Sequence, residues 1–186
     1  MSDEAIPAAT IVVVREPVSG TAPELLIVER AAGMAFAGGA LVFPGGRIDE
    51  ADRRLAADLG LGEDGPQRVA AIRETIEETA IPVGFTSAPS PDDCLDLQSA
   101  LAAGEDFADV LGSRGLSLNP GALAPFARWV PKFHAVRRFD TLFFVAKAPP
   151  GEWAPQALAG ECTGAFWLPA LEVLARGRRG EAQIIF

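Results

Sequence analysis

The residues with the clearest chemical potential are three glutamates near the middle of the chain. The segment Arg73-Glu74-Thr75-Ile76-Glu77-Glu78 places carboxylates at positions i, i+3 and i+4. On a helix, with about 100° of rotation per residue, these side chains share roughly a third of the circumference. Like charges this close repel, and a divalent cation such as Mg²⁺, which takes oxygen ligands and bridges to phosphates, would offset the repulsion. The hexapeptide therefore indicates metal-dependent phosphate chemistry, although a solvated acidic helix face carries the same pattern.

A helix over 67–80 is expected to carry the glutamates. Pro66 suits its first turn, and Pro82 stops it. Arg73 stands about one turn before Glu77 and can orient that carboxylate. The glutamates should face solvent or a cleft, because the apolar residues of the segment form one stripe that faces the core. This stripe consists of Val69, Ile72, Ile76 and Ala80.

Together with the turn Phe43-Pro44-Gly45-Gly46, this segment resembles the signature of the Nudix hydrolases. That signature runs from a Gly through a first Glu to Arg-Glu-aliphatic-x-Glu-Glu-x-Gly, and the match covers about residues 43–81. Asp52 stands where the family has its first Glu, Thr75 replaces an aliphatic residue, and Ala80 replaces a Gly. The last two departures remove no carboxylate, so the resemblance implies an active pyrophosphohydrolase.

The signature is interrupted by an insertion near 53–65. Between Asp52 and Arg73 lie 20 residues where the family has seven. A box split in this way is similar to the branch that contains the peroxisomal acyl-coenzyme A diphosphatases. The resemblance implies hydrolysis of a diphosphate bond in a nucleoside diphosphate linked to another group, with coenzyme A or acyl-CoA as the first choice. ADP-ribose, another dinucleotide or a nucleotide sugar stay open as alternatives.

The resemblance also assigns roles to individual residues. Glu74, Glu77 and Glu78 would bind Mg²⁺ or Mn²⁺, helped by a backbone carbonyl near Gly46. Glu77 and Glu78, with Arg73, would form the catalytic group, in which Glu77 is a metal ligand or the base. Metal-bound water would then attack one phosphorus atom.

Further candidates lie outside the box. The resemblance implies that Glu161, six residues before Trp167, would complete the metal site or act as the base, as an acidic residue near this place does in several Nudix enzymes; alternatively, it is a solvated loop residue. His134 either assists at the phosphate or packs at the surface. Because a guanidinium can clamp phosphate bidentately, three arginines are candidates for substrate binding. They are Arg30, Arg47 and Arg138.

Composition limits the class of protein. A chain of 186 residues with 49% hydrophobic content is expected to form a single domain, 1–186, with a sizeable core. The net charge of -9 and the lack of a basic stripe argue against nucleic acid as the main partner. Cys94 and Cys162 make no disulfide framework and are expected to be small core residues of a reduced, cytoplasmic protein.

No targeting signal is recognised at either end of the given sequence. There is no signal-peptide pattern at the N-terminus and no run of 18 apolar residues that would span a membrane. The C-terminal Ile184-Ile185-Phe186 is no peroxisomal signal; it is either a last strand or the point where a longer protein was cut. The expected partner is a small-molecule nucleotide rather than nucleic acid or membrane, and a homodimer stays open.

Strands and helices alternate along the chain, which predicts the α/β class. A mixed sheet with helices on both faces is expected, in agreement with the Nudix α/β/α sandwich. A helical region over about 88–125 is expected to be an insertion that covers the site. Strands are predicted over 9–15, 24–30, 41–43, 82–85, 127–130, 135–147 and 165–168, and helices over 67–80, 92–103, 106–112 and 169–176.

Two other functions remain open from the sequence. Some Nudix domains bind nucleotides without cleaving them, but such domains often lose a carboxylate of the box, and this chain keeps all three in the helix. A second possibility is an enzyme that removes damaged nucleoside triphosphates. The helical region near 88–125 favours a larger ligand than these.

Overall fold

The computed structural model describes residues 5–17, 22–31, 33, 39–131, 138–160, 162–181 and 183 of the chain. The strands are β1 Ile6–Arg15, β2 Glu24–Arg30, β3 Leu41–Val42, β4 Gly45–Arg47, β5 Ala124–Trp129, β6 Phe139–Lys147 and β7 Cys162–Pro169. The helices are α1 Glu50–Asp58, α2 Gly65–Thr79, α3 Pro91–Ala102, α4 Phe107–Ser113 and α5 Ala170–Arg179, with a 3₁₀ turn at Pro120–Ala122.

All seven strands belong to one mixed sheet. Five of them follow the order β3-β2-β1-β6-β5, while β4 pairs with β1 and β7 pairs with β2. β1 and β6 run parallel. The other pairings are antiparallel. The mixed sheet predicted from the alternating elements is therefore confirmed.

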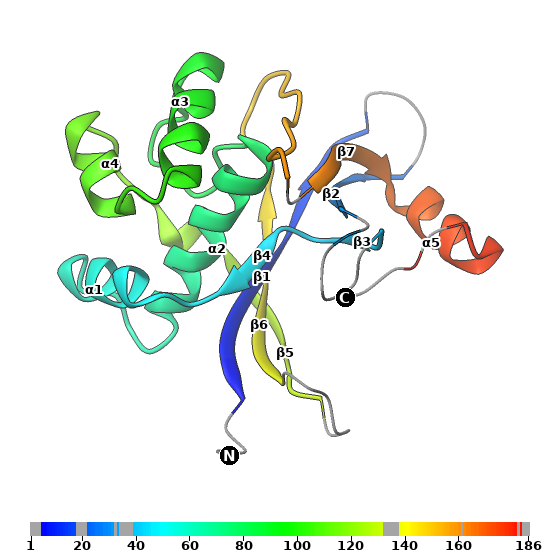
Figure 1. Ribbon diagram of the computed structural model, residues 1–186, viewed down its shortest axis with the longest axis horizontal. Helices are drawn as coiled ribbons and strands as arrows, with labels where there is room; N and C mark the ends of the chain where they lie inside the picture. Colours follow the sequence, from blue (N-terminus) through cyan, green and yellow to red (C-terminus); the bar gives the residue numbers. More distant parts are fainter. Residues whose placement is uncertain are drawn as a thin grey trace.

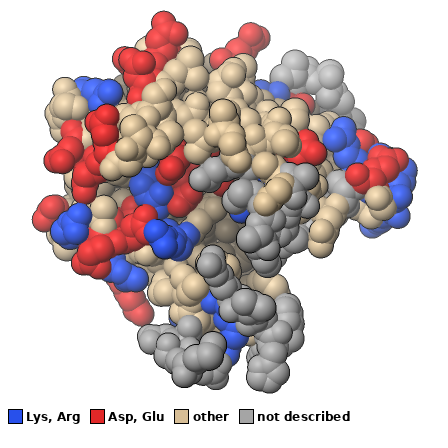
Figure 2. Space-filling view, viewed as in Figure 1, with Lys and Arg blue, Asp and Glu red and all other residues tan. Residues whose placement is uncertain are grey.

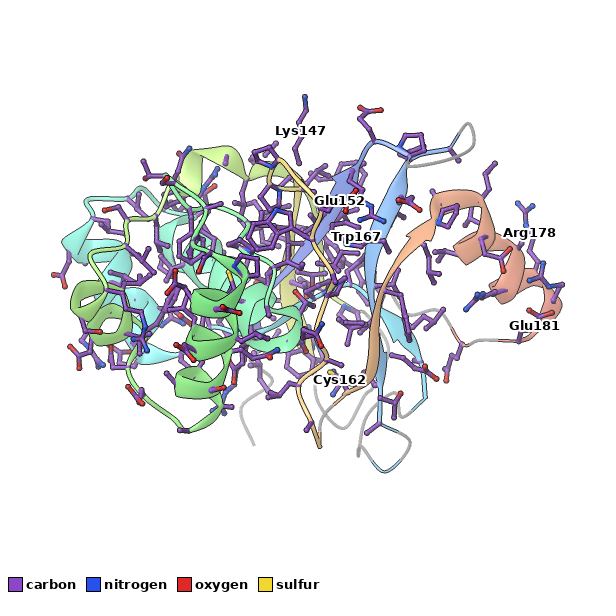
Figure 3. All side chains as sticks on the ribbon, turned by 90° about the horizontal axis from the view of Figure 1, so that it is seen from above. Lys147, Glu152, Cys162, Trp167, Arg178 and Glu181 are labelled. Atoms are coloured by element: carbon purple, nitrogen blue, oxygen red, sulfur yellow. The ribbon has the colours of Figure 1, made fainter. Side chains whose placement is uncertain are left out.

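Helices cover the sheet on two sides. Figure 1 and Figure 3 place α1 to α4 together on one side and α5 on the other, with Arg178 and Glu181 at the far end of α5. The larger core joins the apolar stripe of α2 to β1 and β6, and includes the fully buried Ile72, Ile11 and Phe144. A smaller core joins Ile27 and Leu41 to Val173 of α5. The result is a three-layer α/β/α arrangement.

The helix α2 matches its prediction closely. It begins at Gly65, with Pro66 in its first turn, and ends at Thr79. Ala80 follows in the left-handed conformation, with φ of 56°, and its N–H donates to the Ile76 carbonyl at 2.8 Å. Glycine adopts this conformation without steric cost, which explains why the family signature has Gly where this chain has Ala80.

Three parts of the fold differ from the sequence prediction. The region of the insertion forms a helix, α1, which begins before the inserted residues, at Glu50. The short strand β4 was missed, because three residues with two glycines give no strand pattern. The strand predicted over 82–85 is wrong: the described segment is a turn with Gly84 at φ of 76°, and only Phe85 bridges to Leu118.

The helical region predicted near 88–125 is present. α3 packs against α2, and α4 packs against α1 and α3. That these helices cover the site stays a prediction, as does the limit of the domain. The C-terminal Ile184-Ile185-Phe186, for which a last strand was one of two alternatives, lies outside the described residues. In the described part of the chain, no helix has both the length and the apolar character needed to cross a bilayer.

The two cysteines are buried, as expected of core residues. Burial raises the pKa of the Cys94 thiol to about 12, with a smaller contribution from the negative charge of Asp93. A thiol with so high a pKa is almost entirely protonated at neutral pH and is a poor nucleophile.

Candidate active site

Arg73 is the centre of a polar cluster between α2, α1 and β4. Its Nε and Nη2 donate to the two carboxylate oxygens of Asp52, at 2.9 and 3.0 Å. Its Nη1 lies 2.9 Å from Oε1 of Glu74 and 3.1 Å from Oε2 of Glu77. Its Nη2 also donates to the carbonyl of Arg47 at 3.2 Å. One guanidinium therefore joins three elements, and the contact with Glu77 is the one that the spacing predicted.

The cluster has a closed end and an open end. The Asp52 side chain is 0% exposed and the Arg73 side chain 11%, while Glu74 and Glu77 reach 16% and 22%. Burial opposes the charge of the Arg73 guanidinium, but its hydrogen bonds to Asp52 and the attraction of Glu74, Asp52 and Glu77 outweigh this and raise its pKa. Asp52 thus anchors Arg73 from inside, Glu74 and Glu77 occupy the more accessible side, and Glu78 is buried.

The turn at Gly45-Gly46 brings backbone directly against two of the glutamates. The Gly45 N–H donates to Oε2 of Glu78 at 3.1 Å. A Cβ added at Gly46 would lie 2.4 Å from Oε1 of Glu74, and one at Gly45 would lie 2.3 Å from the carbonyl oxygen of Ala9. A side chain at Gly45 would meet the backbone of β1, so this glycine is required for the close approach of β4 to β1, whereas a side chain at Gly46 would have to displace the carboxylate of Glu74.

The ionisation of Glu74 is strongly disturbed by its surroundings. Burial raises its pKa from 4.5 to about 7. Attraction by Arg73 opposes this shift, whereas repulsion from Glu77 and Asp52 adds to it. Within this cluster one guanidinium faces four carboxylates, of which Asp49 is the most distant at 3.9 Å, so the site has an excess of negative charge.

The donor set fits a hard divalent cation. All the candidate side-chain ligands offer carboxylate oxygens, which Mg²⁺ and Mn²⁺ prefer. A bound cation would also balance the negative charge of the Glu74 carboxylate, which its surroundings disfavour. Among the residues that the structure describes, no three His, Cys, Asp or Glu side chains already converge as a metal site. Arg73 instead holds Glu74 and Glu77, and the Gly45 N–H holds Glu78. Metal binding by these residues stays a prediction.

The surface around the cluster carries both signs of charge. Figure 2 shows acidic and basic side chains interleaved on the face over α1 and α2, whereas the face above, over α3, is mostly uncharged apart from acidic groups at its edge. The face shown thus has no broad basic field, and an anionic ligand bound there would depend on local groups.

The predicted arginines come from three different parts of the sheet region. Arg47 is exposed and pairs with Asp49, with 2.9 Å between Nε and Oδ1, and its carbonyl belongs to the Arg73 cluster. Arg30 ends β2, and Arg138 precedes β6, where its carbonyl accepts the Ile6 N–H at 2.8 Å. Substrate contact by these three side chains stays a prediction. Glu161 and His134 lie outside the described residues.

Sequence reasoning missed the anchoring role of Asp52 and the Gly45 N–H. Asp52 also accepts the Asp49 N–H at 2.8 Å, which forms a capping box at the start of α1. Two acidic residues spaced like Asp49 and Asp52 are a recognisable helix start, and this signal could have revealed α1. Nothing in the sequence indicates which backbone N–H will meet Glu78.

The buried pair of Asp52 and Arg73 predicts a large loss of stability on truncation. Asp52→Ala should lower the free energy of unfolding by about 3 to 5 kcal/mol, because it leaves the guanidinium largely buried without its main partner. Urea denaturation measures the change. Asp58→Ala, at an exposed position of the same helix, is the control and should change stability by less than about 0.5 kcal/mol. Equal effects of the two substitutions would contradict the anchoring role.

The raised pKa of Glu74 predicts how stability depends on pH in metal-free buffer. Between pH 4.5 and about 7 the folded protein keeps a proton on Glu74 that the unfolded chain releases. Stability should therefore fall by up to about 3 kcal/mol as pH rises through this window. Denaturation in EDTA at several pH values would measure the fall, which Glu74→Gln should remove and Glu105→Gln, at an exposed position, should not. A wild-type slope that survives in Glu74→Gln would refute the assignment.

Among the comparisons with known proteins, the comparison with solved structures is the one that finds relatives of this chain. No family model and no curated protein matches the chain. The structure is similar to the crystal structure of a Nudix hydrolase from Alicyclobacillus acidocaldarius, with a TM-score of 0.82 and 30% sequence identity. That match covers 98% of this chain and 86% of the other.

More distant likenesses share the fold alone. One is the Nudix domain of NrtR from Shewanella oneidensis, solved with ADP-ribose, at a TM-score of 0.54 and 16% identity over 94% of this chain and 79% of that one. Another is a MutT protein from Methanosarcina mazei Go1, at a TM-score of 0.51 and 12% sequence identity; the match covers 94% of this chain and 85% of that one. These matches confirm the α/β/α sandwich predicted from the sequence.

Proposed function

Since this chain belongs to the Nudix hydrolases and is a pyrophosphohydrolase of that family, we propose that it cleaves the diphosphate bond of coenzyme A or an acyl-CoA. The family supplies the reaction, hydrolysis of a nucleoside diphosphate linked to another group. The observation that carries the catalytic part is the intact set of Glu74, Glu77 and Glu78 beside the Gly45-Gly46 turn. The choice of coenzyme A is supported by the split box, whose extra residues build much of α1.

The cation site of this proposal consists of oxygen donors. Glu74, Glu77 and Glu78, with a carbonyl near Gly46, would hold Mg²⁺ or Mn²⁺. Bound there, the cation supplies neutralisation of phosphate charge and a more acidic water molecule. The approach of Gly46 to Glu74 supports the pairing of these two ligands, because any side chain at position 46 would displace the carboxylate.

The protein's own residues hold the reacting groups in place. Arg73 holds the carboxylates of Glu74 and Glu77, and the Gly45 N–H holds Glu78, so all three are kept on the side of α2 that faces the glycine turn. Glu77 is the candidate to accept a proton from the attacking water, because its side chain is more exposed than that of Glu74. Glu161 is the second candidate for this step.

Phosphate groups of the substrate need positive partners from the protein as well. Arg47 is the favoured one, because its side chain is 71% exposed and its backbone already touches the Arg73 cluster. Arg30 and Arg138 are further candidates. We propose that the protein works in the cytoplasm on a small-molecule nucleotide.

A substrate panel tests the proposal. Phosphate release, coupled to a phosphatase, should be fastest with coenzyme A and acyl-CoA among ADP-ribose, NADH and nucleoside triphosphates in Mg²⁺ or Mn²⁺. Glu78→Gln should lower kcat/KM by roughly a thousandfold or more, because a carboxylate ligand and its negative charge are lost. Glu63→Gln, at an exposed position, is the control.

The possible outcomes separate the alternatives. Preferred cleavage of ADP-ribose, a dinucleotide, a nucleotide sugar or a triphosphate would keep the reaction and overturn the choice of coenzyme A. Metal-dependent turnover that survives in Glu78→Gln would overturn the assigned site. Nucleotide binding without turnover of any substrate would favour a non-catalytic module.

A further inference from the structure

The last turn of α2, which carries Glu77 and Glu78, is fixed by distant parts of the chain. A helix leaves its last four carbonyls without partners inside the helix. All four find donors: the carbonyls of Ile76, Glu77, Glu78 and Thr79 accept from the Ala80 N–H (2.8 Å), the Gln98 side chain (2.9 Å), the Leu158 N–H (3.3 Å) and the Gln156 N–H (2.8 Å). Three of these donors come from α3 or from the segment before β7.

Gln98, on α3, is the one side-chain donor in this set. Its Nε2 donates to the carbonyl of Glu77 at 2.9 Å and to the carbonyl of Gln156 at 2.8 Å. A carboxamide nitrogen has two hydrogens, so both are used. The residue is only 9% exposed, and water has little access to replace these bonds. One amide group therefore ties α2, α3 and the segment before β7 together.

The segment that contains Gln156 has a second anchor on the sheet. The indole N–H of Trp167, on β7, donates to the carbonyl of Trp153 at 2.8 Å. Figure 3 shows Trp167 in the middle of the molecule, with the chain before β7 passing between the helical layer and that strand. Gln98 thus joins the last turn of α2 to a segment that is itself attached to the sheet.

We propose that Gln98 is a positioning residue for the hydrolysis: by bridging the carbonyls of Glu77 and Gln156, it sets the last turn of α2, and with it the carboxylates of Glu77 and Glu78. The inference rests on the proposed function, because it concerns the same glutamates. The bonded carbonyl belongs to Glu77 itself, so a displacement of this carbonyl moves the reacting side chain directly. Misplacement of a catalytic group by about 1 Å can cost about a hundredfold in rate.

Gln98 is not needed to attach α3 to the core. The apolar residues Cys94, Leu97 and Leu101 of this helix are buried in the main core and hold it there. Loss of the amide would leave two inaccessible carbonyl oxygens without their donor while this apolar packing stays. The contact can therefore be removed with the fold retained.

Two substitutions of similar size separate positioning from packing. Q98M has no donor at any pH. In Q98E the introduced carboxyl faces two carbonyl oxygens, so it donates only when protonated, and its burial favours the protonated form as pH falls. Ser99→Ala is the control, because the Ser99 hydroxyl bonds only within its own helix, to the Leu95 carbonyl at 2.8 Å.

The kinetic test uses the substrate that the wild type cleaves best. At pH 8, Q98M and Q98E should lower kcat about tenfold to a hundredfold with a much smaller change in KM. As pH falls, the ratio of kcat in Q98E to kcat in wild type should rise, while the ratio for Q98M stays flat. Wild-type kinetics in both variants would overturn the inference alone. Absence of wild-type turnover would overturn the proposed function, and this inference with it.

Amide hydrogen exchange provides a readout that does not need activity. In Q98M the Gln156 and Leu158 amides, which donate to α2, should exchange at least about tenfold faster than in wild type, and the sheet amides should not. Ser99→Ala should leave both rates unchanged. Uniform acceleration across the whole molecule, or equal losses in kcat and 1/KM with a flat pH ratio for Q98E, would indicate a purely structural role and overturn the inference.

Discussion

The interaction on which the site depends is the guanidinium of Arg73 among the carboxylates of Asp52, Glu74 and Glu77. The hydrogen bonds to Asp52 offset the free-energy cost of burying the Arg73 guanidinium, and Asp52 also caps α1. The start of α1 and the polar face of α2 are therefore held together. The contact of Arg73 with the Arg47 carbonyl adds β4. Without the Arg73 guanidinium, the carboxylates of Asp52, Glu74 and Glu77 would repel one another in a partly buried place, and β4 would lose its hydrogen bond from α2.

The engagement of Arg73 with these carboxylates also bears on how an acidic protein can act on an anionic substrate. With a net charge of -9 there is no long-range attraction for phosphate, so recognition has to come from local positive groups. Arg73 is already committed to the glutamates, which leaves the role to a bound cation and to accessible arginines such as Arg47. The hydrogen bonds of Gln98 to the carbonyls of Glu77 and Gln156 would then hold the last turn of α2, and with it the glutamates, in place for such a cation.

Sequence reasoning worked where a local pattern decides the structure. The apolar stripe of α2, the flanking prolines and the spacing of the glutamates predicted the helix and its polar face, while the glycine turn was linked to them by the resemblance to the Nudix signature. It failed at α1, where a capping box of two aspartates was overlooked, and at 82–85, where apolar residues pack in a turn. The partners of Gln98 and Gly45 lie far away in sequence, so no local pattern could reveal them.

The most direct test of the account is calorimetric titration of Mn²⁺ into the wild type and Glu74→Gln near pH 6.5, in two buffers with different heats of ionisation. If the Arg73 cluster holds the cation, the wild type should release protons on binding, because burial keeps Glu74 partly protonated at this pH. Glu74→Gln should bind at least about tenfold more weakly and without that release. Equal affinity and equal proton release in the two proteins, or no binding to the wild type, would contradict the account.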